Sequence, residues 1–143
     1  NQTGRSLYRG TKYAMTQDPM ANRFVMTFLK QRNKAAIEEY VEAELMYQFV
    51  TTGKIGEIKG LKISSESYVA GLTDVPGELY RYAVKAATAR DYTTVTKCAE
   101  AAEEIIGELI ECNLTSYLRN KFDQAKTAVS KIEHVVYELS LRK

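Results

Sequence analysis

Histidine and cysteine are scarce in this chain, and their scarcity excludes several kinds of site. Of 143 residues, one is histidine (His134) and two are cysteines (Cys98 and Cys112). A di-iron carboxylate bundle needs two Glu-x-x-His motifs, and serine nucleophile chemistry would need His134 together with a Gly-x-Ser-x-Gly turn that is missing. We therefore expect His134 to be structural or exposed. Because the cysteines lack Cys-x-x-Cys spacing, we expect both to be reduced, small core residues of an intracellular protein.

Other absences narrow the class further. No stretch approaches 18 apolar residues and no signal-peptide pattern is present, which argues against a membrane span and favours a cytoplasmic protein, with the nucleus as the eukaryotic alternative. There is no glycine loop of the P-loop or dinucleotide-binding type. The formal net charge of +2 is too small to indicate nucleic-acid binding by itself, so such binding needs a local patch. The composition is that of one ordinary globular domain over 1–143.

Only two prolines and eight glycines interrupt the chain, and they fall between long stretches of helical periodicity. Asp18 followed by Pro19 is a helix start, since an acidic N-cap precedes proline at the first helical position. No strand-like alternation of useful length and no internal repeat occurs. The sequence predicts an all-α antiparallel bundle, with 1–17 irregular or the end of a preceding helix. The predicted helices span about 19–51, 64–89, 91–111 and 116–141.

Two pairs of acidic residues are the strongest candidates for chemistry. Glu39 and Glu42 lie on the first predicted helix, and Asp74 and Glu78 lie on the second. Side chains three or four residues apart share a helix face, with Cβ atoms about 5–6 Å apart. If the two pairs face each other, four carboxylates surround a site suited to a hard divalent cation such as Mg²⁺, with Mn²⁺ as a substitute.

The plainer explanation is that these acids are solvated surface charges. On the first helix, however, Glu39 and Glu42 lie among apolar residues opposite the main apolar stripe, which indicates a helix packed on two sides. The main stripe holds Ile37, Val41 and Leu45, and the opposite side holds Phe28, Ala35, Met46 and Val50. On the second helix, Asp74 and Glu78 lie beside Ala70, Gly71 and Gly77, small residues that suit the close approach of another helix, a metal or a phosphate backbone. The alternative for this pair is simple ion pairing with Arg81 and Lys85.

Basic residues cluster in 30–34, upstream of Glu39. This cluster is either the solvated flank of a long helix or a guide for an RNA backbone towards the carboxylates. Arg32 is the best candidate because it lies seven residues before Glu39, on nearly the same face. Arg81 has the matching position after Glu78.

Three segments resemble the translin family. They are EYVEA at 39–43, YVAGLTDVPGELYR at 68–81, and KIEHVVYELSLR at 131–142. Within the family the chain is most similar to translin-associated factor X, the catalytic partner, because translin itself lacks the full acidic set. The short link between the acidic helices resembles an archaeal or otherwise compact member. The family's first long helix is not recognisable before Gly10, so we expect a truncated N-terminus.

The resemblance implies an α-helical subunit of a barrel-like octamer that encloses RNA. By this likeness Glu39, Glu42, Asp74 and Glu78 bind Mg²⁺ and cleave single-stranded RNA, or the unpaired or nicked strand of a small duplex, endonucleolytically. The octamer would be homomeric or shared with a translin-like subunit. Two alternatives stay open: a non-catalytic nucleic-acid-binding subunit with structural acids, and a helical assembly module that binds no nucleic acid.

Overall fold

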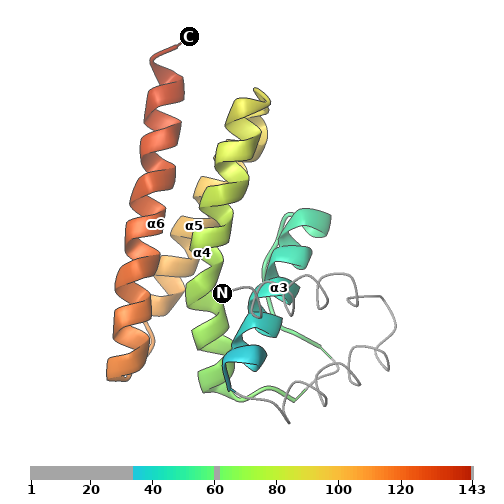
Figure 1. Cartoon of the computed structure of the whole chain (residues 1–143), viewed down its shortest axis with the longest axis vertical. Coiled ribbons are helices and arrows are strands. Elements are labelled where there is room, and N and C mark those ends of the chain that lie inside the picture. Colours follow the sequence, from blue (N-terminus) through green and yellow to red (C-terminus); the bar gives the residue numbers. More distant parts are fainter. Residues whose placement is uncertain (1–33, 60–61, 143) are drawn as a thin grey trace. The chain divides into compact units, whose positions relative to one another are not determined.

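The computed structural model describes residues 34–59 and 62–142, and within these ranges all regular structure is helical (Figure 1). The predicted all-α class is confirmed. The helices are α3 (Lys34–Thr52), α4 (Ser65–Thr88), α5 (Tyr92–Ile110) and α6 (Ser116–Ser140). Their observed ends lie close to the predicted ones, apart from the start of the first predicted helix. That start, the cluster at 30–33 and the segment 1–17 lie outside the described residues.

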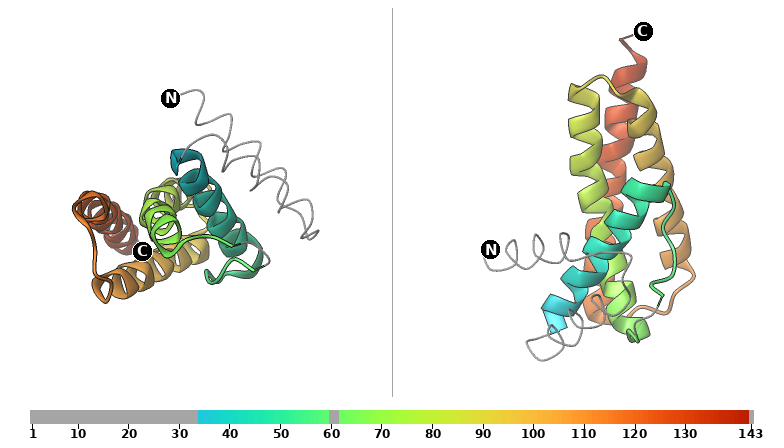
Figure 2. Two further views of the ribbon diagram at one scale, coloured as in Figure 1. Left: turned by 90° about the horizontal axis from the view of Figure 1, so that it is seen from below. Right: turned by 90° about the vertical axis from the view of Figure 1, so that its right-hand side faces the viewer.

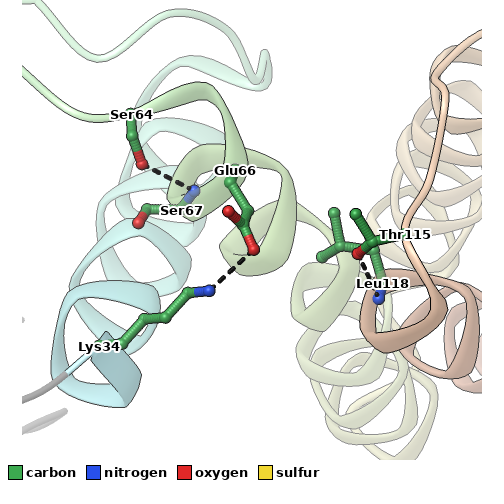
Figure 3. Close-up of polar contacts among 6 residues, drawn as sticks. All are labelled: Lys34, Ser64, Glu66, Ser67, Thr115 and Leu118. Atoms are coloured by element: carbon green, nitrogen blue, oxygen red, sulfur yellow. Dashed lines mark hydrogen bonds and ion pairs between the residues drawn. The ribbon is translucent and has the colours of Figure 1, made fainter.

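Polar side chains cap three of these helices at their N-termini. The Ser64 hydroxyl accepts a hydrogen bond from the Ser67 amide at 3.2 Å, and the Thr115 hydroxyl accepts one from the Leu118 amide at 3.4 Å (Figure 3). Asp91 caps α5, with one carboxylate oxygen 3.2 Å from the amide nitrogen of Thr94. Short polar side chains here satisfy amides that the first helical turn leaves unbonded, which is why the helices begin at these positions.

The chain divides into two compact units, 1–72 and 73–143, with the boundary inside α4. In the first unit, α3 contacts the first two turns of α4. Lys34 pairs with Glu66 at 2.8 Å (Figure 3). Two hydrogen bonds hold the loop between α3 and α4. The Tyr68 hydroxyl donates to the carbonyl of Gly56 at 2.9 Å, and the side-chain amide of Gln48 donates to the carbonyl of Glu57 at 3.1 Å.

The second unit contains the rest of α4 together with α5 and α6, running up, down and up (Figures 1 and 2). α5 and α6 pack directly against each other. Lys131 of α6 lies over the ring of Tyr80 on α4, with Nζ 5.7 Å from the ring centroid. The core of this unit is aliphatic and consists mainly of Val75, Leu79, Ala83, Val95, Cys98, Ala102, Ile105, Leu109, Leu118, Ala125 and Ile132.

The two cysteines differ in burial, although the sequence predicted that both lie in the core. Cys98 is buried as expected, but Cys112 is exposed, so the prediction that both cysteines are core residues is wrong for Cys112. Cys112 follows the last turn of α5, where the apolar stripe has already ended at Leu109.

His134 is exposed, as predicted, and lies 3.1 Å from Glu138 on the same helix. No helix in 34–59 or 62–142 has the length and apolar character that a bilayer crossing requires.

Candidate functional site

The first acidic pair lies on a helix that is buried on most of its surface. Glu39 and Glu42 are both half-buried, although each is flanked by fully buried neighbours. Of the described residues expected on the second apolar side of α3, Met46 is buried, so packing on two sides is confirmed for the middle of the helix, whereas Ala35 and Val50 near its ends are exposed. The buried residues of α3 are Ala36, Glu38, Tyr40, Val41, Ala43, Leu45, Met46 and Phe49. Carboxylates held in such surroundings are costly to leave uncompensated, which distinguishes this pair from ordinary surface charges.

Three further polar groups on α3 were missed by the sequence analysis. Glu38 is only 4% exposed. One carboxylate oxygen of Glu44 and the hydroxyl of Tyr40 are buried, with no hydrogen-bond partner among the described residues. Burial raises the pKa of the Glu44 carboxyl, and a hydrogen bond from Gln48 offsets part of this shift. Burial, reinforced by the charge of Glu44, raises the pKa of Tyr40. The signal available in the sequence was the four-residue spacing of Tyr40, Glu44 and Gln48, which puts them on one face.

A glycine brings the beginning of α4 against α3. A Cβ atom at Gly71 would lie 2.5 Å from Cβ and Cγ1 of Val41 and 2.9 Å from the carbonyl oxygen of Glu38. The prediction that small residues on α4 admit a close neighbour is confirmed here, and the neighbour is another helix. Gly77 is different, since no atom of the described part of the chain lies within 4 Å of the corresponding Cβ position.

The second acidic pair is already neutralised by basic side chains. Asp74 accepts two hydrogen bonds from Nζ of Lys121 on α6, both at 2.9 Å. Glu78 pairs with Arg81 one turn later at 2.9 Å, where the arginine is 76% exposed and the glutamate 22%. Pairing of Glu78 with Arg81 was one of the predicted alternatives. For Asp74, the sequence suggested Arg81 or Lys85 as partner, whereas the structure provides a lysine 47 residues away.

The described residues place each acidic pair within its own unit, Glu39 and Glu42 in the first, Asp74 and Glu78 in the second. Among these residues no three His, Cys, Asp or Glu side chains converge on a position that would hold a metal ion. Mg²⁺ generally retains several waters and binds through one or two carboxylates, so a half-buried carboxylate pair has the right donor chemistry for it. The metal site and its four proposed ligands stay predictions. Arg32 lies outside the described residues.

Solved structures share this helical architecture. The structure titled apo-NeC3PO aligns with a TM-score of 0.76 at 18% identity, covering 95% of this chain and 83% of that one. The structure titled AfC3PO aligns with a TM-score of 0.71 at 20% identity, covering 96% and 87%. At these identities the likeness establishes the fold, an all-α bundle of the type seen in those two proteins.

Sequence comparison identifies the family. The model of the translin family matches residues 13–143, and the chain belongs to that family. It is 32% identical over 117 residues to the translins of Gallus gallus, Bos taurus and Homo sapiens. These matches cover 76% of this chain and 50% of each translin, so the matched region spans about half the length of those relatives. The closer likeness to translin-associated factor X stays a prediction from the four acids, since these relatives are translins.

Proposed function

We propose that this translin-family protein is a Mg²⁺-dependent endoribonuclease that acts on single-stranded RNA within an oligomer. The observation that carries this proposal is the position of Glu39 and Glu42. They are half-buried on the middle of α3, where most of the other residues are buried. A solvent-facing charge pair needs no such surroundings, and carboxylate oxygens are the ligands that Mg²⁺ prefers.

In this proposal the protein residues bind the metal ion and position the attacking water and the RNA. Glu39, Glu42, Asp74 and Glu78 supply the carboxylate oxygens, and not all four need bind the ion directly. One of them can instead accept the proton of the attacking water as a general base. A bound Mg²⁺ would activate water and stabilise negative charge on the scissile phosphate. Mn²⁺ is the expected substitute ion.

RNA contact is assigned to arginines beside the acids. Arg81 is 76% exposed, and its guanidinium lies next to Glu78, so it is available to a phosphate oxygen near the acidic pair. Arg32, which lies outside the described residues, is the matching candidate by its sequence position, seven residues before Glu39. The proposed assembly is an octamer, either homomeric or shared with a translin-like subunit.

A second candidate function is a non-catalytic nucleic-acid-binding subunit. The ion pairs of Asp74 with Lys121 and of Glu78 with Arg81 favour it, because both acids already have cationic partners. In that case the second pair is structural, and the protein binds RNA without cutting it.

Incubation of a labelled single-stranded RNA with the purified chain, in Mg²⁺ and in EDTA, separates the two candidates. The proposed nuclease cuts the RNA only with the divalent ion. Salt-dependent RNA binding without cutting, by a folded oligomer, would instead support the binding subunit. Absence of both binding and cutting would leave only the helical assembly module.

A further inference from the structure

We propose that Lys121 is a built-in counter-ion that competes with the divalent cation for Asp74, and that its displacement sets the metal affinity of the site. This inference rests on the proposed function, since it gives a regulatory role to a residue at one of the proposed metal ligands. Lys121 lies outside the three segments that resemble the translin family.

The geometry of the contact differs from that of a loose surface ion pair. Nζ of Lys121 lies 2.9 Å from both Oδ1 and Oδ2 of Asp74. Both carboxylate oxygens of Asp74 therefore accept a hydrogen bond from the same ammonium group. The lysine side chain is 16% exposed and the aspartate 32%, so water screens their attraction less than it would at the surface.

Two features hold the ammonium group in position. The ring of Tyr117, one turn earlier on α6, lies beneath it, with Nζ 5.6 Å from the ring centroid. Such an approach attracts a cation to the face of an aromatic ring. Lys121 also follows Leu118, a core residue that is 4% exposed, so its helix is anchored in the core beside the contact. The amine is thus placed on Asp74 by α6.

A cation on Asp74 must displace this ammonium group or bind beside it and be repelled by it. Either event weakens metal binding relative to a carboxylate without a lysine. The lysine also keeps a partly buried carboxylate compensated when no metal is bound, which a bare site would not do. Lys121 is in this account a positioning residue, and it affects the metal through Asp74.

The test is the affinity of the full chain for Mn²⁺, measured from the electron paramagnetic resonance signal of the free ion. Lys121→Met removes the charge and keeps the length of the side chain, and we expect roughly tenfold tighter binding, equivalent to about 1.4 kcal/mol. Lys121→Arg keeps the charge and should bind Mn²⁺ like the wild type. Lys126→Met removes one charge from the exposed part of the same helix, where Lys126 pairs with Asp123, and should change the affinity little.

Thermal unfolding provides a second readout that a purely structural salt bridge would not produce. Without metal, Lys121→Met should melt below the wild type because Asp74 loses its partner. Saturating Mn²⁺ should then raise the melting temperature of the variant more than that of the wild type, because tighter binding stabilises the folded state more. Lys121→Gln provides a polar, uncharged alternative if the methionine variant does not fold.

The outcomes separate this inference from the function on which it rests. If the wild type binds Mn²⁺, Asp74→Asn weakens that binding and Lys121→Met leaves it unchanged or weaker, the role of Lys121 is overturned and the metal site stands. Equal tightening by Lys121→Met and Lys126→Met would also overturn it, because the effect would then be one of overall charge. If neither the wild type nor either neutral Lys121 variant binds Mn²⁺, both the metal site and the role of Lys121 are wrong.

Discussion

Gly71 of α4 and Val41 of α3 approach so closely that no side chain fits between them. A Cβ atom on Gly71 would lie 2.5 Å from two carbon atoms of Val41, which is itself fully buried. Val41 stands between Glu39 and Glu42 in the sequence. The closeness of the two helices at this point therefore fixes the segment of α3 that carries the first acidic pair.

Gly71→Ala should lower the free energy of unfolding by about 1–3 kcal/mol, because the added methyl group must push α3 away. Gly77→Ala is the matched control, since it lies on the same helix and its Cβ position is open among the described residues. That variant should be more stable than the wild type by about 0.5–1 kcal/mol, the usual benefit of alanine over glycine in a helix. Urea denaturation of both variants measures the difference. Equal effects of the two substitutions would contradict the close packing of α3 on α4.

Tyr40→Phe should leave stability unchanged or raise it by about 1 kcal/mol, because the Tyr40 hydroxyl is buried with no hydrogen-bond partner among the described residues. The phenyl ring keeps the packing, since Tyr40 is only 1% exposed. The measurement is the midpoint of urea denaturation at neutral pH. A clear loss of stability would show that the hydroxyl makes a hydrogen bond in solution.

Glu44→Gln should stabilise the protein at pH 7 and lose this advantage as the pH falls. Burial raises the pKa of Glu44 in the folded state, so folding favours the protonated carboxyl. The stability linked to that proton is fully present below the unfolded pKa of about 4.3 and is lost as pH rises through the folded value. Glutamine is neutral throughout and avoids the loss. Unfolding free energies at pH 4 and pH 7 test this, and a larger advantage at pH 4 would contradict it.

The two cysteines should differ sharply in reactivity. Burial, together with the negative charge of Asp91, raises the pKa of the Cys98 thiol to about 11, whereas Cys112 is exposed. Because the thiolate is the reactive form, iodoacetamide at neutral pH should modify Cys112 quickly and Cys98 only after unfolding. Mass spectrometry of native and denatured protein counts the modified sites. Rapid modification of Cys98 in the native protein would show that its surroundings open.

The sequence was sufficient for most of the helices because their signals are local. Asp91 and Thr115 cap α5 and α6 close to the predicted helix starts at 91 and 116. Cys112 was mispredicted because residue type was used without its position beyond the end of α5. Cys112 lies two residues beyond Ile110, the last residue of α5, and is exposed there.

The candidate site was less accessible from sequence because its decisive contacts are not local. Asp74 and Lys121 are 47 residues apart, and no spacing rule links them. The pairing of Glu78 with Arg81 was predicted, because residues three apart share a helix face. The buried Glu44 oxygen was missed because the four-residue spacing of Tyr40, Glu44 and Gln48 shows that they share a helix face but not that this face is buried.

Cleavage of labelled single-stranded RNA by Glu42→Gln in Mg²⁺ tests the central claim most directly, with wild type and Glu108→Gln measured alongside. Glu108 is an exposed glutamate on α5, so its substitution makes the same chemical change on a helix that carries neither acidic pair. We predict metal-dependent cleavage by the wild type and Glu108→Gln, and at least about a 100-fold loss in Glu42→Gln, with its helical content retained. Undiminished cleavage by a folded Glu42→Gln protein would contradict the assignment of catalysis to these carboxylates.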